Sequence, residues 1–261
     1  MPSLARPRGL IYAAVMNRRL AHLFVAAAIA LGSTSSAIAE APPPRYERTA
    51  PTSDGIGKRY MGREIARIMG WQGAEWLERA EREQEERTDL MLPELKLAPG
   101  MSVADIGAGT GYIARRMAKL VGPRGSVYAV DVQPEMMRML AAMVKRENLP
   151  NIKPVLGAIA DVRLEPDSID MAIMVDVYHE LEQPYELVAS IVRALKVGGR
   201  LVFVEYKAED PSIPIKALHK MSVEQVKREA ATHPLEFERI EGKLPWQHII
   251  VFRKVAQPSS K

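Results

Sequence analysis

The chain of 261 residues is 47% hydrophobic and 26% charged, a globular composition that excludes extensive disorder. It contains no cysteine, which excludes disulfide bonds, thiolate metal sites and a cysteine nucleophile. The net charge of +4 comes from residues 1–39, which hold four arginines and no acid; the remaining residues carry 32 Lys+Arg and 32 Asp+Glu. This balance leaves no basic excess to bind phosphates, so we expect no nucleic-acid partner.

Residues 1–39 have the pattern of a secretory signal. A basic stretch, MNRRL, begins at Met16, the apolar run LAHLFVAAAIALG follows it, and the small residues AIA stand directly before Glu40. The apolar run is too short to span a bilayer, which favours cleavage before Glu40 over retention as an anchor. The pattern predicts a periplasmic or otherwise exported protein that contacts the membrane transiently through this segment. A start at Met16 and a membrane-tethered protein are the alternatives.

Two segments are expected between the signal and the main domain. Residues 40–57, rich in proline and small polar residues, predict a flexible linker. Residues 58–97 predict a helical cap, with helices in REIARIMG and in GAEWLERAEREQEERTDLMLPEL. The second helix carries a dense Glu/Arg run with opposite charges at helical spacing, which is typical of a solvated face.

Residues 98–255 alternate short apolar runs with amphipathic stretches. Strands are expected in MSVADI, SVYAVD, IKPVL, SIDMAIMVD and RLVFVEY, and helices in YIARRMAKLV, PEMMRMLAAMVKREN, YELVASIVRAL and SVEQVKREAATH. Strands that are apolar along their length and alternate with helices indicate a parallel sheet covered on both faces. LEFERI and HIIVFRKV then add an antiparallel pair, and residues 256–261 form a tail. The pattern predicts a doubly wound α/β fold with a mostly parallel, seven-stranded sheet.

The stretch ADIGAGTGY joins the first of these strands to the following helix. It contains the pattern G-x-G-x-G, whereas the dinucleotide fingerprint is G-x-G-x-x-G and would need glycine in place of Tyr112. Asp105 stands before the turn, where it would repel a pyrophosphate and attract a cationic cofactor. Asp131 ends the second strand, where a carboxylate can accept both hydroxyls of a ribose. The turn therefore favours an adenosine cofactor that carries positive charge.

With these motifs, and with Asp170 in SIDMAIMVD and the stretch LKVGGRLVFVEY, residues 90–254 resemble the class I S-adenosylmethionine-dependent methyltransferases. The resemblance implies a Rossmann-like fold and S-adenosylmethionine as cofactor. The loop after the first strand would hold the methionine part, and Asp131 the ribose. The expected cofactor-binding residues are Asp105, Gly107, Ala108, Gly109, Gly111, Asp131, Val132, Asp161 and Asp176. After the third strand the family often has Gly-Asp-Ala, whereas this chain has GAIAD, which offsets Asp161 from the adenine.

The candidate catalytic residues lie in MVDVYHEL, at the carboxyl edge of the fourth strand, where open parallel sheets bind ligands. Methyl transfer needs no covalent enzyme intermediate, and it needs a base only where the acceptor loses a proton. His179 is the candidate base and Tyr178 the residue that orients the acceptor. The alternative is that Tyr178 caps the pocket while His179 begins a helix. Because His219, His233 and His248 lack metal-ligand spacing, no metal is expected.

The resemblance does not identify the methyl acceptor. A small-molecule or lipid-like acceptor fits a neutral chain. The expected neighbours of the acceptor are PSIPIKALHKMS and the segment before the sheet, with Tyr60, Met61, Trp71 and Trp76; the alternative is that these aromatic side chains are packing anchors. Two alternatives are a non-catalytic periplasmic binding or scaffold protein and an NAD-dependent oxidoreductase, which Tyr112 disfavours. Export separates the protein from the cytosol, where S-adenosylmethionine is made. The protein would then meet cofactor outside, stay tethered, or keep the fold without catalysis. No oligomeric state is predicted.

Overall fold

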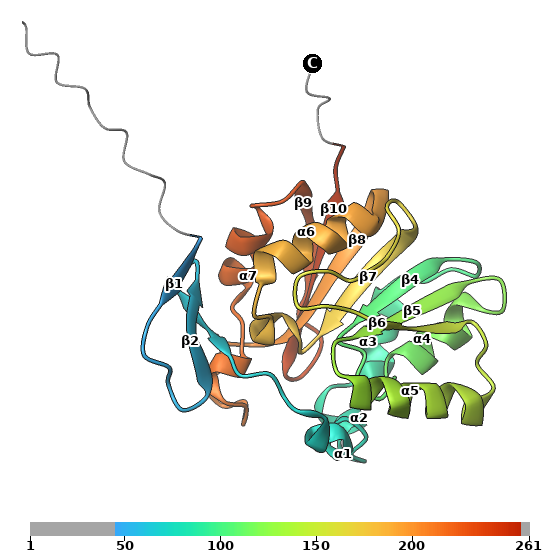
Figure 1. The fold of residues 1–261 in the computed structure, drawn as a ribbon, viewed down its shortest axis with the longest axis horizontal. Helices are drawn as coiled ribbons and strands as arrows, with labels where there is room; N and C mark the ends of the chain where they lie inside the picture. Colours follow the sequence, from blue (N-terminus) through green and yellow to red (C-terminus); the bar gives the residue numbers. More distant parts are fainter. Residues whose placement is uncertain (1–44, 257–261) are drawn as a thin grey trace, which may run out of the picture. The chain divides into compact units, whose positions relative to one another are not determined.

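The computed structural model describes residues 45–256, which form two β-sheets connected by short helices (Figure 1). The predicted signal segment 1–39 lies outside the described residues, as do the start of the predicted linker and residues 257–261 of the tail. Over the described range, none of the helices combines the length and the apolar character needed to cross a bilayer.

The larger sheet has seven strands in the order β6-β5-β4-β7-β8-β10-β9. Its strands are β4 (Ser102–Ile106), β5 (Ser126–Asp131), β6 (Ile152–Leu156), β7 (Ile169–Val175), β8 (Leu195–Tyr206), β9 (Leu235–Glu241) and β10 (Gln247–Lys254). The first five run parallel, whereas β10 is antiparallel to both of its neighbours, β8 and β9. This confirms the predicted Rossmann-like, mostly parallel sheet with an antiparallel terminal strand.

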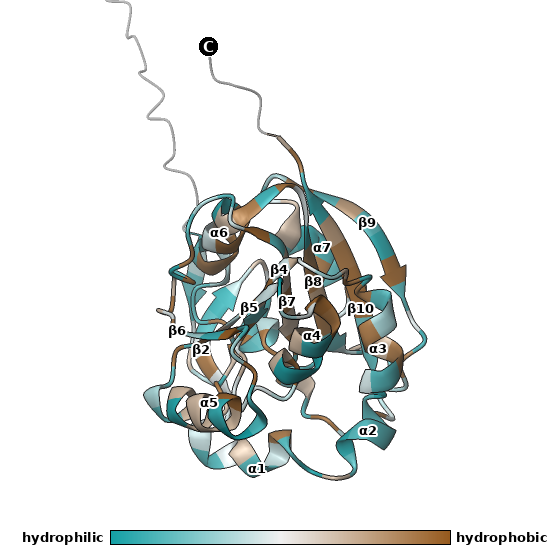
Figure 2. Cartoon of the chain, turned by 90° about the vertical axis from the view of Figure 1, so that its right-hand side faces the viewer, coloured by the Kyte–Doolittle hydropathy of each residue, from teal (hydrophilic) through white to brown (hydrophobic). Residues whose placement is uncertain are grey.

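Helices cover both faces of this sheet and bury a core on each side. The helices are α4 (Ala114–Val121), α5 (Pro134–Glu147), α6 (Pro184–Ala194) and α7 (Val223–Ala230). Ala104 packs with α6 and α7, whereas its neighbour Val103 packs with α4 and α5, because successive side chains of a strand point to opposite faces. Figure 2 shows hydrophobic residues along β8 and β10, and mixed colours on the edge strand β9.

Residues 46–66 form a small antiparallel sheet, which includes the first part of the predicted cap. The linker expected to Gly57 and the helix expected in REIARIMG are therefore both wrong. The sheet consists of β1 (Tyr46–Arg48), β2 (Gly55–Tyr60) and β3 (Arg63–Ala66), in that order. Met61 and Gly62 form a two-residue turn between β2 and β3, and both have positive φ, at 47° and 93°. A two-residue turn with positive φ suits the right-handed twist of a hairpin. Gly62 was the sequence signal for this turn, and it was not used in the prediction.

The predicted helical cap is broken into short pieces, and its charged run is only in part a solvated face: Glu75, Glu78 and Glu81 are exposed, whereas Arg82 and Glu86 are buried. The pieces are η1 (Trp71–Gly73), α1 (Ala74–Leu77), α2 (Arg82–Glu85) and α3 (Thr88–Glu94). Arg82 and Glu86 are 4% and 3% exposed, and the Arg82 Nε donates to Glu86 Oε2 at 2.7 Å. Tyr206 in β8 also donates to Glu86, at 3.0 Å. Glu86 is buried because its partner Tyr206 lies in the main sheet, and sequence spacing does not reveal a partner so distant in the chain.

A buried ion pair connects the small sheet to the main domain. Arg63 in β3 donates from Nε to Glu229 Oε1 at 2.7 Å and from Nη2 to Oε2 at 3.1 Å, and Glu229 belongs to α7. A third donor, Nη1, reaches the carbonyl of His179 at 3.2 Å. The pair therefore holds β3 against the segment that follows β7, where the candidate site lies.

Candidate functional site

A cleft of about 480 Å³ opens at the carboxyl ends of β4, β5 and β7. The glycine turn after β4 forms part of its wall, and Asp131 and Val132 after β5 form another part. Trp76 and Leu77 of the cap and residues 214–216 and 219 line it from outside the sheet. Of the residues predicted to lie beside an acceptor, Trp76 and part of PSIPIKALHKMS line the cleft, whereas Tyr60, Met61 and Trp71 do not.

The glycine turn follows β4 and leads into α4 with three glycines in positive φ, namely Gly107, Gly109 and Gly111, at 72°, 53° and 87°. The backbone N–H groups of Gly107 and Ala108 donate to the Val130 carbonyl at 2.8 and 3.0 Å, which fixes the turn against β5. Gly107 and Gly109 line the cleft, whereas Ala108 and Gly111 do not. The turn therefore presents backbone, without side chains, to any ligand in the cleft.

We expect Gly107→Ala to destabilise the protein by about 2–3 kcal/mol. A Cβ there would lie 2.5 Å from Val177 Cγ2 and 2.8 Å from its Cγ1, and a β-branched side chain cannot easily move away. Gly100→Ala is the matched control, because Gly100 has φ +90° but nothing within 4 Å of its added Cβ. Gly100→Ala should lower the free energy of unfolding, measured in urea, by only about 1 kcal/mol, the cost of placing alanine at positive φ. Equal losses in both variants would contradict the proposed clash.

Asp131 connects the glycine turn to the end of β5. Its Oδ2 accepts from the Gly109 N–H at 2.9 Å, and its Oδ1 accepts from the Gln133 N–H at 2.9 Å. The residue is 6% exposed, and burial raises the pKa of its carboxyl group. Each carboxylate oxygen has a second lone pair, so Asp131 can hold the turn and still accept hydroxyl groups from the cleft.

Two further carboxylates at this site each have an oxygen without a partner among the described residues. Asp105 Oδ2 is buried under the glycine turn, and Asp176 Oδ1 is buried at the end of β7. The other oxygen of Asp176 accepts from Gln247 Nε2 at 2.7 Å. Burial raises the pKa of Asp105 to about 7 and that of Asp176 well above its usual range. Asp176 lines the cleft, whereas Asp105 lies beneath it.

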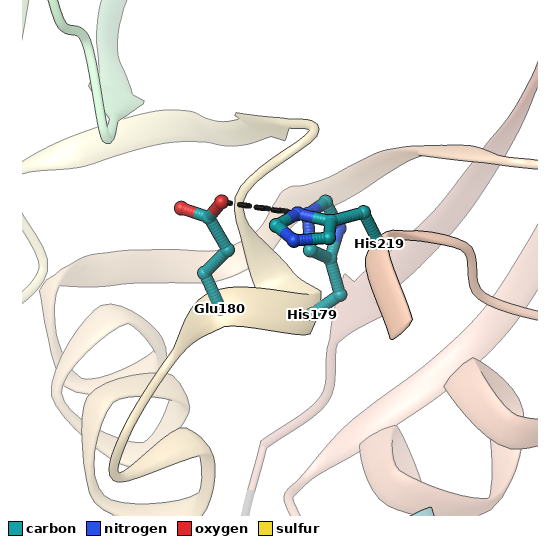
Figure 3. A group of neighbouring side chains, drawn as sticks. All are labelled: His179, Glu180 and His219. Carbon is teal, nitrogen blue, oxygen red and sulfur yellow. Dashed lines mark hydrogen bonds and ion pairs between the residues drawn. The ribbon is translucent and has the colours of Figure 1, made fainter. Parts of the chain in front are cut away.

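His179 lies in η2 (Tyr178–Glu180), lines the cleft and is 2% exposed. Its Nδ1 is 2.5 Å from Glu205 Oε2, and its Nε2 is 3.2 Å from Nδ1 of His219, which belongs to η3 (Ala217–His219). Glu180 places Oε1 3.2 Å from the same His219 nitrogen (Figure 3). The hydrogen bond with Glu180 raises the pKa of His219. Two imidazoles and a carboxylate thus converge at one wall of the cleft.

Besides Asp105, Ala108 and Gly111, two further predicted site residues do not reach the cleft. Tyr178 is 1% exposed and packs in the core, with its ring 4.8 Å from that of Phe203, so the role of orienting an acceptor is wrong for this side chain. Asp161 points away: its Oδ1 accepts from Ser190 Oγ at 2.7 Å and from Arg193 at 3.0 Å. Ala158 of GAIAD and the adjacent Val162 line the cleft instead, and they offer an apolar surface there.

Sequence analysis missed Glu205 and His219. Glu205 lies in the apolar run VFVEY of β8 and is 0% exposed, so an acid inside a buried strand was the available signal. His219 is forty positions from His179, and no local motif connects the two residues. Only the fold brings them together, because β7 and β8 are neighbours and both continue into loops at this edge.

The sheet order, the glycine turn and the acid after β5 together define a Rossmann-like domain that binds an adenosine cofactor. A family model described as a methyltransferase domain matches residues 104–203. An arsenite methyltransferase from Halobacterium salinarum is 30% identical over 105 residues, 40% of this chain and 27% of that protein. A protein-L-isoaspartate O-methyltransferase from Methanothrix thermoacetophila is 29% identical over 136 residues, 52% of this chain and 62% of that protein.

Among solved structures, a SAM-dependent methyltransferase from Aquifex aeolicus has a similar fold. Its TM-score is 0.68 at 23% identity, and the match covers 72% of this chain and 100% of that chain. Residues 104–203 therefore match a methyltransferase domain, and the fold around them is similar to that of a SAM-dependent methyltransferase. The chain spans less than two thirds of the length of the two curated relatives named above.

Proposed function

We propose that the protein transfers a methyl group from S-adenosylmethionine to a small-molecule or lipid-like acceptor. The observation that carries the proposal is the cleft itself, which unites the glycine turn, Asp131 and His179 at one edge of the sheet. The matched methyltransferase domain includes all three. A cofactor site and a candidate base therefore share one cavity.

The chemistry of the cleft fits this cofactor. Asp131 has lone pairs free for the two ribose hydroxyls, and the glycine turn leaves room for the methionine chain. Asp176 lines the cleft with an unpartnered oxygen, and an ammonium group bound there would favour its ionised form and that of Asp105 beneath the cleft. Apolar side chains near the ends of β5 and β6 offer a surface for adenine, namely Val132, Met136, Ala158 and Val162. When bound, the cofactor supplies a methyl group on a sulfonium.

The residues toward the outer wall of the cleft would select and deprotonate the acceptor. Trp76, Pro214 and Ile215 give this wall an apolar character that suits a small organic or lipid-like molecule. His179 would take the proton of an acceptor hydroxyl or amine, and Glu205 would stabilise the imidazolium that forms. Since each relative's acceptor belongs to that relative, the particular acceptor is left to experiment.

A test of the cofactor assignment is calorimetric titration of the full chain with S-adenosylhomocysteine, with NADH as the parallel ligand. We expect micromolar binding of the first and none of the second. Asp131→Ala should weaken binding about 10- to 100-fold, because it removes the ribose acceptor and releases the Gly109 N–H. Asp161→Asn is the matched control and should change affinity less than about threefold, since its carboxylate faces Ser190 and Arg193.

The outcomes separate the candidate functions. Equal affinity in wild type and Asp131→Ala would refute the ribose assignment. Tight binding of NADH alone would support an oxidoreductase. Binding of S-adenosylhomocysteine without methyl transfer to any of a broad set of acceptors would favour the binding or scaffold protein.

We further propose that residues 1–39 are a cleaved signal, so that the mature protein begins at Glu40 in the periplasm or beyond. The support is the sequence pattern of this segment. Mass spectrometry of the protein recovered from a Gram-negative host should give a mature N-terminus at Glu40. An intact N-terminus at Met1 or Met16 would refute cleavage and favour a tethered protein.

A further inference from the structure

We propose that His179, Glu180 and His219 form a binding site for a divalent transition-metal ion, of which Zn²⁺ is the representative (Figure 3). These three residues each offer one ligand atom, and the three atoms lie within 4.8 Å of one another. Because two of the donors are imidazoles, the set suits Zn²⁺ and its transition-metal neighbours better than Mg²⁺ or Ca²⁺, which prefer oxygen ligands.

The distances between the donors match those around one ion. His219 Nδ1 is 3.2 Å from both His179 Nε2 and Glu180 Oε1, and these two atoms are 3.9 Å apart. Ligands bound to a tetrahedral zinc ion at about 2.0–2.1 Å are separated by roughly 3.3 Å. The triangle therefore needs little adjustment to accept an ion at its centre.

A second carboxylate holds each histidine in the orientation that a metal ligand needs. Glu205 Oε2 accepts from His179 Nδ1 at 2.5 Å, which leaves Nε2 directed into the triangle. Asp54 Oδ2 lies 3.2 Å from His219 Nε2, which leaves Nδ1 directed to the same point. Metal-binding histidines usually donate their other ring N–H to a carboxylate in this way. The Met69 N–H similarly holds Glu180 by Oε2, at 3.2 Å, so that Oε1 is available.

The local charge also favours a cation. Glu180, Glu205 and Asp54 bring three carboxylates to the two histidines, against one nearby ammonium, that of Lys216, which lies 2.7 Å from Asp54 Oδ1. The Arg63 guanidinium, which contacts the His179 carbonyl, is already balanced by Glu229. An excess of negative charge therefore surrounds the triangle, which a divalent ion would neutralise.

The three ligands come from the wall of the cleft, so an ion there would have its remaining positions directed to the cavity. This is the arrangement of catalytic zinc sites, which use three protein ligands and leave a position for water or substrate. If the proposed methyl transfer holds, the ion would replace His179 as the group that promotes deprotonation, because it occupies the Nε2 lone pair: an acceptor hydroxyl bound to the ion would lose its proton more readily. That consequence rests on the proposed function; the metal site does not.

The rival explanation is that the cluster holds only a proton shared between His219 and its neighbours. Metal titration distinguishes the two. We would treat the full, untagged chain with a chelator, dialyse it, and titrate it with Zn²⁺ in a calorimeter and with Co²⁺ under visible absorbance, which reports nitrogen and oxygen ligands in a tetrahedral site. We expect one Zn²⁺ per chain, a rise in Tm on binding, and Co²⁺ absorption bands that Zn²⁺ abolishes.

Two ligand variants and one control make the test specific. His219→Ala and the isosteric Glu180→Gln should each weaken Zn²⁺ binding on the order of 100-fold or more. His248→Ala is the matched control, since His248 also pairs with a carboxylate, Glu209 at 2.9 Å, but lies outside the cluster. It should bind Zn²⁺ like wild type. Circular dichroism and Tm of each variant establish that it is folded, and Glu180→Gln keeps the test valid if His219→Ala does not fold.

Absence of Zn²⁺ binding to the wild type, or equal affinity in wild type and Glu180→Gln, would overturn the proposal. Titration of the metal-free protein with S-adenosylhomocysteine is a separate measurement, which reports on the cofactor site alone. Failure of the metal site and failure of the proposed function are therefore distinguishable.

Discussion

In the ligand-free protein, Asp105 is expected to lower the free energy of unfolding as the pH rises from about 4 to about 7, so Asp105→Asn should gain stability relative to wild type over this window. Burial raises the pKa of Asp105 from 3.8 to about 7. Below pH 4 the folded and the unfolded chain both hold the proton, so the group does not favour either state. Between the two values the unfolded chain releases the proton while the folded chain retains it, and stability is lost.

Each unit of the pKa difference corresponds to about 1.4 kcal/mol, so the full effect of Asp105 approaches about 4 kcal/mol above pH 7. The asparagine variant keeps the shape of the side chain and does not ionise. Asp176 also has a raised pKa, because of burial, and it adds to the loss, whereas burial lowers the pKa of His233 to about 4 and opposes it; the contribution of Asp105 is therefore the difference between the wild-type and variant curves. Urea unfolding across this pH window measures both curves.

Asp161→Asn provides the control for this experiment. The N–H of Arg163 and the hydroxyl of Ser190 hold the pKa of Asp161 below its usual value. Its contribution is therefore present at neutral pH and is lost only as the pH falls below about 4. The Asp161→Asn variant should show the same pH dependence between pH 4 and 7 as wild type. Parallel curves for wild type and Asp105→Asn over this window would show that Asp105 is ionised in the folded protein.

Glu229→Gln is expected to destabilise the protein by about 3–5 kcal/mol. Glu229 is 0% exposed and accepts two hydrogen bonds from Arg63, whose side chain is 12% exposed. Removing the carboxylate charge leaves the guanidinium buried without a counterion, and the desolvation of that cation is no longer offset. Thermal or urea unfolding gives the loss directly.

Glu224→Gln is the matched control on the same helix. Glu224 is 81% exposed on its side chain and lies 3.9 Å from Lys227 Nζ, so solvent screens the pair. Its replacement should change stability by less than about 1 kcal/mol. Replacing both Arg63 and Glu229 by leucine should restore much of the loss, since no buried charge then remains. A loss below 1 kcal/mol for Glu229→Gln would contradict the importance of the pair.

The main sheet was predictable because its signal is local. Strands buried on both faces must be apolar along their length, and the helices between them must be amphipathic, so the pattern over residues 98–255 specifies the fold class. The small sheet was not predictable in this way. Its buried polar residues, Lys58 and Glu64, depend on the Glu182 carbonyl and on the N–H groups of Thr52 and Gly57, which only the folded chain brings close.

The same distinction applies to the candidate site. Gly107 and Asp131 each end a strand, and parallel strands place such ends at one edge, so sequence placed them at the cleft. Side-chain direction after a strand depends on the local turn, which explains why Tyr178 and Asp161 were misassigned. His219 reaches His179 through a loop whose path no spacing rule predicts.

The position of β10 in the sheet determines when the sheet can be completed during synthesis of the chain. β10 is the last strand in the chain, yet it lies inside the sheet between β8 and β9. Until residues 247–254 have left the ribosome, β9 has no strand to pair with and one edge of β8 is open. The sheet therefore closes only after translation is nearly finished. If residues 1–39 are the cleaved signal proposed above, a sheet that closes so late would leave the chain accessible to a translocation channel for most of its synthesis.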